Sequence, residues 1–180
     1  MGPIVEKIEE ANEKACGEKT ALLPMAFPEG SPMHPAYGAG HATVAGACVT
    51  MLKAFFDTDS VLVRDKKGAV RFKRFEKGDV PVSYITDLGV DEGIGCELIE
   101  LKQGKHPLTL EGELNKLAAN ISIGRNMAGV HYFTDYYDSL RMGEEIAIGM
   151  LEEQALGYPT DPFVMSVPTF DGPTVRIGAR

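Results

Sequence analysis

Apolar residues recur at helical spacing in the first part of the chain. Pro3 at a first helical position, followed by an amphipathic pattern that stops at Gly17, predicts a short helix from Pro3 to about Cys16. Residues 22–40 contain four prolines and three glycines, a density of breakers that predicts a loop. From His41 to Phe56 the chain is apolar nearly all round, which predicts a helix at the centre of the core.

Two further long helices and several short strands follow. Glu111 to about Ala128 and Phe133 to Leu156 carry apolar residues at helical spacing, and Gly157 stops the second helix. Alternating segments predict two β-hairpins and one more strand: Ser60–Val63 with Val70–Phe75, Phe163–Val167 with Thr174–Ile177, and Val80–Ile85. Residues 86–108 show no pattern that places them. The expected fold is one mainly α domain over residues 1–180, a helical bundle with small β-hairpins.

Composition narrows the class of protein. The 180 residues, 44% hydrophobic and 24% charged, are typical of a soluble globular domain. A net charge of -8 and a pI near 5.0 disfavour nucleic acid as a partner. No stretch reaches the ~18 apolar residues of a membrane span, and the first residues lack the pattern of a secretory signal. We therefore expect no membrane partner and leave the localisation unassigned.

Cysteines and basic residues add little chemistry. Three widely spaced cysteines predict neither a disulfide scaffold nor a zinc site. Cys48 lies in a run of small residues and is expected to be a buried, inert thiol. The basic cluster is predicted to be the solvated face of a hairpin and consists of Lys66, Lys67, Arg71, Lys73 and Arg74.

A glycine-rich turn leads into the predicted central helix. Gly38 and Gly40 precede His41, and such a turn directs free backbone amides and the positive end of the helix dipole at one spot, which favours an anion. His41 at the same place is a candidate general acid or base. In the alternative interpretation the glycines only turn the chain and His41 packs at the helix start, and this segment alone does not decide between the two.

A second constellation is Arg125-x5-His131-x3-Asp135. An arginine offers planar donors to an oxyanion, and a neutral imidazole can bind a metal centre through one nitrogen. Asp135, four residues beyond His131, could accept the proton on the other nitrogen and fix the tautomer. The alternative is an exposed histidine with a surface carboxylate, which would contribute only tenths of a kcal/mol.

Taken together, the two segments resemble vanadium haloperoxidases and the related acid phosphatases. The runs His34-Pro-Ala-Tyr-Gly-Ala-Gly-His41 and Gly124-Arg-Asn-Met-Ala-Gly-Val-His131 are similar in particular to the bromoperoxidases of red algae and cyanobacteria. The similarity extends from Leu22 to Ile177, and it implies the helical bundle of the vanadium haloperoxidase and acid phosphatase type.

The resemblance implies a role for each motif residue. His131 would be the axial vanadium ligand, and Arg125 with the backbone at Ala39 and Gly40 would bind the vanadate oxygens. His41 would be the acid–base residue beside the apical oxygen.

Two more residues take supporting roles in that pattern. Asp135 would orient the imidazole of His131. His34 matches a histidine near the halide pocket, and its alternative role is that of a loop histidine with a local hydrogen bond.

The implied activity is the vanadate-dependent oxidation of bromide by hydrogen peroxide to a hypobromous-acid equivalent, which halogenates organic acceptors. Phosphate could occupy the same site, and the family also implies a homo-oligomer. Two alternatives stay open. One is a phosphatase in which His131 is the nucleophile and His41 protonates the leaving group. The other is a helical oligomer or anion-binding module without catalytic activity.

Two departures from the family pattern weaken the anion site. Ala39 stands where the family usually has serine, so one side-chain hydrogen bond is lost. The first signature, a lysine followed by Arg-Pro, is absent, since no Arg-Pro dipeptide occurs and no arginine precedes Arg64. We expect the chain to be the C-terminal part of a larger enzyme. Otherwise a partner chain, or Lys7, Lys14 or Lys19, would supply the missing cations.

Overall fold

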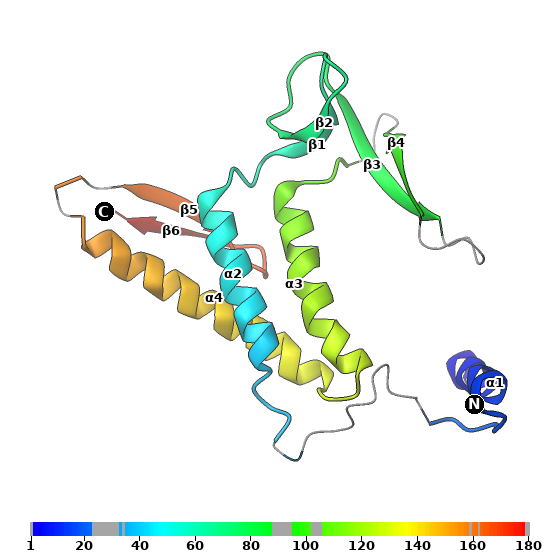
Figure 1. The fold of residues 1–180 in the computed structure, drawn as a ribbon. Coiled ribbons are helices and arrows are strands. Elements are labelled where there is room, and N and C mark those ends of the chain that lie inside the picture. Colours follow the sequence, from blue (N-terminus) through cyan, green and yellow to red (C-terminus); the bar gives the residue numbers. More distant parts are fainter. Residues whose placement is uncertain are drawn as a thin grey trace.

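The structure, a computed structural model, describes residues 2–22, 33, 35–87, 95–101, 106–158, 160–161 and 163–178. The helices within these residues are α1 (Pro3–Cys16), α2 (Gly40–Phe55), α3 (Leu110–Met127) and α4 (Phe133–Leu156). The strands are β1 (Val61–Arg64), β2 (Val70–Lys73), β3 (Val80–Asp87), β4 (Gly95–Glu100), β5 (Val164–Pro168) and β6 (Thr174–Gly178). The predicted mainly α class with small hairpins is confirmed (Figure 1).

The predicted helices agree with the observed ones to within one residue at each end. Their ends have local causes: Gly17 adopts a left-handed φ of 78° after α1, and the Thr109 side chain accepts a hydrogen bond from the Gly112 amide at the start of α3. Strand β4 was not predicted. It completes an antiparallel sheet of order β2-β1-β3-β4, in which Val82 of β3 faces Glu100 of β4.

Helix α2 crosses α4 with the two backbones in contact. A Cβ added to Gly46 would lie 2.2 Å from the Leu140 carbonyl oxygen, and one added to Gly143 would lie 2.0 Å from the Thr43 carbonyl oxygen. Only glycine fits at both positions, because any side chain there would push the helices apart. The crossing therefore fixes where α2 and α4 meet.

Helix α2 lies at the centre of the core as predicted, but several of its large apolar residues do not fill that core. The buried face of α2 consists of Ala42, Ala45, Gly46, Val49, Thr50 and Lys53. Val44 is 62% exposed and Phe55 is 81% exposed. Because a close helix crossing admits only small side chains, the bulky residues point away from α4. Cys48 is exposed for the same reason, contrary to the expected buried thiol.

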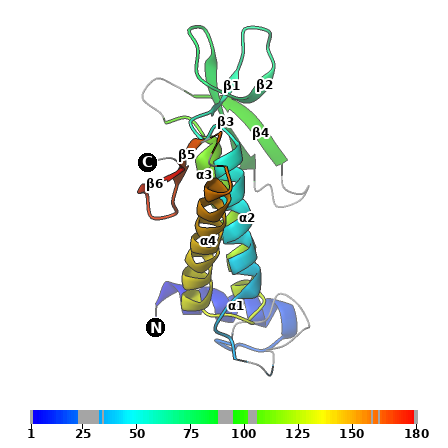
Figure 2. The ribbon, with the colours of Figure 1, turned by 90° about the vertical axis from the view of Figure 1, so that its left-hand side faces the viewer.

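The β5–β6 hairpin packs against both α2 and α4. Val167 of β5 and Ile177 of β6 pack with Leu151 of α4 in a second core cluster, to which Ala54 of α2 also contributes. This arrangement buries one face of the hairpin against both helices, while Figure 2 shows the four-stranded sheet at one end of the bundle.

The basic residues of the first hairpin are exposed as predicted, except Lys73, which is partly buried, and three of the five form ion pairs. Arg71 pairs with Asp65 at 2.5 Å and Arg74 with Asp57 at 2.5 Å. Lys73 Nζ lies 3.0 Å from the Asp79 carboxylate. These cations are neutralised within the hairpin and its flanks. No helix in the described part of the chain has the length and apolar character needed to cross a membrane.

Candidate functional site

Three chain segments meet at one end of the bundle. The start of α2 carries His41, the last turn of α3 carries Arg125, and the connection into α4 carries His131. Figure 1 shows these helix ends together at the lower part of the bundle. The rings of His41 and His131 lie 5.0 Å apart between centroids, with an interplanar angle of 35°. The two motifs noted in the sequence thus form one site.

The His131 imidazole is held by two oxygen acceptors on the same ring nitrogen. Nδ1 lies 2.8 Å from the Ala36 carbonyl oxygen and 3.4 Å from Asp135 Oδ2. Both neighbours only accept, so Nδ1 carries the proton and Nε2 keeps its lone pair. The side chain is 8% exposed, which limits its motion. Nε2 of His131 is therefore a fixed donor atom that can bind a metal centre.

Asp135 organises the first turn of α4 as well as the histidine. Its Oδ2 accepts a hydrogen bond from the Tyr132 amide at 3.0 Å, and its Oδ1 accepts one from the Thr134 hydroxyl at 3.4 Å. The carboxylate is buried, and its charge lies at the positive end of the helix dipole. The expected contact with His131 exists, but the Ala36 carbonyl is the nearer acceptor. A backbone carbonyl in a loop leaves no sequence signal.

The start of α2 presents its backbone amides without a side-chain cap. Ala39 is the N-cap residue, and its amide donates to Ser139 Oγ at 2.9 Å. By helix geometry the amides of Gly40, His41 and Ala42 have no partner within α2. A Cβ at Gly40 would meet no other protein atom within 4 Å, so the space beside this residue is open to a ligand. These amides can bind an oxyanion.

Ser139 is a part of the site that sequence reasoning missed. It is 1% exposed and holds the Ala39 backbone that leads into the first turn of α2. Ser139 lies four residues after Asp135, on the same face of α4. This spacing was the available signal, although serine within a helix has many other uses.

His41 is tuned toward its neutral form. Burial is the largest cause that lowers its pKa below the ordinary 6.5, and electrostatic repulsion lowers the pKa further, from Arg125 and from the His131 ring whenever that ring is protonated. A hydrogen bond between Nε2 and the Ser122 carbonyl oxygen, at 3.3 Å, opposes part of this shift. A neutral His41 can accept a proton near neutral pH.

His34, expected near the halide, lies outside the described residues. Among the residues that are described, no group of three or more His, Cys, Asp and Glu side chains is arranged to hold a metal cation. The arrangement at His41 and His131 is of another kind: one imidazole lone pair, helix amides and a guanidinium. This donor set fits a tetrahedral oxyanion such as vanadate bound through a single nitrogen.

Comparison with known proteins identifies the family. A profile described as the VCPO second helical-bundle domain matches residues 10–155. The chain belongs to the vanadium-dependent haloperoxidase family. Within this family it is 46% identical over 184 residues to the vanadium-dependent bromoperoxidase of Corallina pilulifera. The matched region covers 98% of this chain and 27% of that protein.

Two further relatives have the same description. The vanadium-dependent bromoperoxidase of Corallina officinalis is 45% identical over 181 residues, covering 97% of this chain and 26% of that protein. The enzyme of Ascophyllum nodosum is 38% identical over 141 residues, covering 78% of this chain and 21% of that protein. This member of the vanadium-dependent haloperoxidase family thus spans about a quarter of the length of the curated relatives that it matches.

Proposed function

We propose that this chain forms the vanadate-binding bundle of a bromoperoxidase, which oxidises bromide with hydrogen peroxide to a hypobromous-acid equivalent. The observation that carries the proposal is the state of His131. Its Nδ1 proton is directed to the Ala36 carbonyl oxygen at 2.8 Å, and its Nε2 lone pair remains available beside His41. The bromoperoxidase names of relatives that are 38–46% identical support the same activity.

Each residue of the site has a role in this proposal. His131 Nε2 would hold vanadium, and the Gly40 amide, the Ala39 backbone and the Arg125 guanidinium would bind the vanadate oxygens. Bound vanadate would supply a Lewis-acid centre that makes hydrogen peroxide electrophilic toward bromide. The protein residues neutralise the negative charge of this centre and keep the lone pair of His131 directed at it.

Proton transfer is assigned to His41. Its lowered pKa keeps the ring neutral near neutral pH, so His41 would accept a proton from hydrogen peroxide as the peroxide approaches. Asp135 would hold the orientation of His131 through its 3.4 Å contact with Nδ1. His34 is proposed to lie near the bromide, as the resemblance implies.

The chain lacks the Lys and Arg-Pro pattern that supplies two cations in the first family signature. Each charge-assisted contact with the anion contributes about 1.5–3 kcal/mol, so a site without them would bind vanadate weakly. We propose that further polypeptide of the same enzyme, or another subunit of a homo-oligomer, supplies these cations. The large exposed apolar side chains of α2 and α3, among them Phe55 at 81% and Met127 at 67%, suit burial in such an assembly.

A bromination assay tests the proposal. The metal-stripped chain is mixed with bromide, hydrogen peroxide and a chromogenic acceptor, with and without orthovanadate. Activity should require orthovanadate, should disappear in His131→Ala, and should persist in His106→Ala, which removes an exposed histidine elsewhere. Phosphate-ester hydrolysis that continues without vanadate and exceeds bromination would favour the phosphatase alternative. A folded oligomer that catalyses neither reaction would favour the non-catalytic module.

A further inference from the structure

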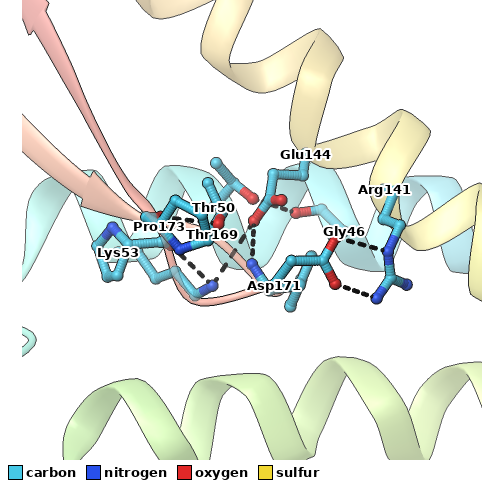
Figure 3. A network of polar contacts seen from close by, with 10 residues as sticks. Gly46, Thr50, Lys53, Arg141, Glu144, Thr169, Asp171 and Pro173 are labelled. Carbon is cyan, nitrogen blue, oxygen red and sulfur yellow. Dashed lines mark hydrogen bonds and ion pairs between the residues drawn. The ribbon is translucent and has the colours of Figure 1, made fainter.

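A second polar network lies beside the α2–α4 crossing, and Figure 3 draws it with Gly46 of the crossing among its residues. Its centre is Lys53 of α2, whose side chain is fully buried. Lys53 Nζ donates to the Pro168 carbonyl oxygen at 3.0 Å, lies 3.8 Å from Glu144 Oε1 of α4, and sits 4.1 Å from the centroid of the Phe170 ring. A buried lysine thus reaches the end of β5 and the turn that follows.

Glu144 holds the same turn from α4. Its Oε1 accepts a hydrogen bond from the Phe170 amide at 2.8 Å. Outside this contact, Arg141 Nε donates to Asp171 Oδ2 at 3.0 Å, and a second guanidinium nitrogen pairs with the other carboxylate oxygen. The turn at residues 169–173, which joins β5 to β6, is therefore docked on both α2 and α4.

Hydrogen bonds to backbone atoms carry much of this docking. Burial lowers the pKa of Lys53 and raises the pKa of Glu144, so both groups are held toward their neutral forms. The charged groups that face them are Glu111 of α3, Arg141 of α4 and Asp171 of the turn. The hydrogen bonds to Pro168 and Phe170 end on backbone atoms, which need a donor and an acceptor but no net charge. The contact of Lys53 with the Phe170 ring, in contrast, depends on the lysine charge.

Phe170 packs the docked turn against the core cluster that α2 shares with α3 and α4. This cluster extends from the start of α2 to Val49, and its buried members are Ala39, Ala42, Ala45, Val49, Ala118 and Leu140. Ala39 is the N-cap residue of α2 and donates its amide to Ser139 of α4. The same two helices thus carry the turn contacts and the site, with the glycine crossing between them. The small residues at the crossing fix the point at which α2 and α4 touch. The turn docked on both helices then fixes the angle between them.

We infer that Lys53 and Glu144 are positioning residues: they dock the β5–β6 turn between α2 and α4 and thereby set the placement of His41 relative to His131. The expected effect on anion binding rests on the proposed function, because the placement of His41 determines whether His131 and the amides of α2 can bind the same anion. Neither residue touches the anion. Their effect passes through Phe170 and Ala39.

The test compares truncation with a conservative change. Glu144→Ala removes the acceptor of the Phe170 amide, whereas Glu144→Gln keeps a carbonyl acceptor and removes only the charge. Phe170→Ala removes the side chain that reaches the Ala39 cluster. Val63→Ala in β1 is a matched control, because Val63 is fully buried in the four-stranded sheet and its truncation destabilises the protein away from the crossing.

Two readouts are measured for each variant. The first is amide hydrogen exchange at Ala39, taken as a ratio to exchange at Leu62, whose amide donates to the Leu108 carbonyl oxygen in the sheet region. The ratio should rise about ten-fold in Glu144→Ala and Phe170→Ala. The second is the dissociation constant of orthovanadate by calorimetry, which should rise about ten-fold in the same variants, as for outer-shell partners of metal ligands.

The conservative variant and the control decide the mechanism. Glu144→Gln should stay within about two-fold of the original chain in both readouts, and Val63→Ala should lower the melting temperature without raising the exchange ratio. An unchanged ratio in both alanine variants would overturn the inference, as would a Gln variant that behaves like the Ala variant. If the original chain binds no orthovanadate, the proposed function fails, while the exchange ratio still decides whether these residues position Ala39.

Discussion

The polar groups near the two ends of α2 have opposite uses. Around His131, backbone and side-chain acceptors occupy one ring nitrogen and leave Nε2 available. Around Lys53 and Glu144, the polar atoms point at the turn of the β5–β6 hairpin and are used within the fold. The first end holds chemistry ready for a ligand, and the second end holds the helices in place. The glycine crossing between the two ends should couple them.

The largest effect is expected at the crossing itself. Gly143→Ala places a Cβ 2.0 Å from the Thr43 carbonyl oxygen, so the helices must separate. The free energy of unfolding should fall by about 3 kcal/mol, the upper part of the range for overpacked cores. Chemical denaturation measures this change.

The matched control lies on the same helix. A Cβ at Gly149 of α4 would meet no other atom within 4 Å, so Gly149→Ala should stabilise the chain by about 0.5–1 kcal/mol through helix propensity. If Gly149→Ala lost as much free energy of unfolding as Gly143→Ala, the backbone contact at Gly143 would not be what couples the two ends of α2.

The next largest effect distinguishes anion binding at the site from the stability of the fold. In Asp135→Asn the orthovanadate dissociation constant should rise about ten-fold, because the charge behind the His131 imidazole is lost. The free energy of unfolding should fall by only about 0.3–1 kcal/mol, the contribution of a carboxylate at a helix N-terminus. Asp138→Asn, an exposed change on the same helix, should leave both values almost unaltered. Equal dissociation constants for the two variants would argue against a role of Asp135 behind His131.

The pH dependence of stability tests the role of Glu144 beside the β5–β6 hairpin. Because the pKa of Glu144 is raised by burial above its ordinary 4.5, the folded state favours the protonated carboxyl. That contribution to stability is fully present below pH 4.5 and is lost as the pH rises through the raised pKa. Glu144→Gln should therefore gain stability relative to the original chain across this window. A relative loss with rising pH would show that the charge on Glu144 stabilises the turn.

Much of the fold follows from the sequence, for reasons visible in particular residues. Helix spacing and stops such as Gly17 and Gly157 act locally, so all four helices were predictable. The exposure of Val44 and Phe55 was not, because the apolar pattern does not say which face of α2 finds a partner. The decision lies in Gly46 and its distant contact at Leu140.

The same limit applies to the site. The histidines, Arg125 and Asp135 stand in a recognisable motif, and the structure brings His41 to His131. The Ala36 carbonyl that holds His131 is a backbone group that every residue has, so no residue type in the sequence marks it. Lys53 and Glu144 look like ordinary surface charges on helices, and only the tertiary fold buries them under the hairpin.

The smallest effect is expected at the rim of the network. The Arg141–Asp171 pair is partly solvent-exposed, with 25% of the Arg141 side chain and 57% of the Asp171 side chain accessible, and exposed pairs contribute about 0.2–1 kcal/mol. Arg141→Gln should lower the free energy of unfolding by less than about 1 kcal/mol and leave the Ala39 exchange ratio unchanged. A change in that ratio as large as in Glu144→Ala would move the anchor of the turn from the buried pair to its exposed neighbour.

Direct titration of the metal-stripped chain with orthovanadate, beside His131→Ala and His106→Ala, tests the central claim. The account predicts saturable binding at one site per chain, which is lost in His131→Ala and retained in His106→Ala. Binding that is equally strong in His131→Ala, in a chain that remains folded, would contradict the assignment of His131 as the residue that holds vanadium.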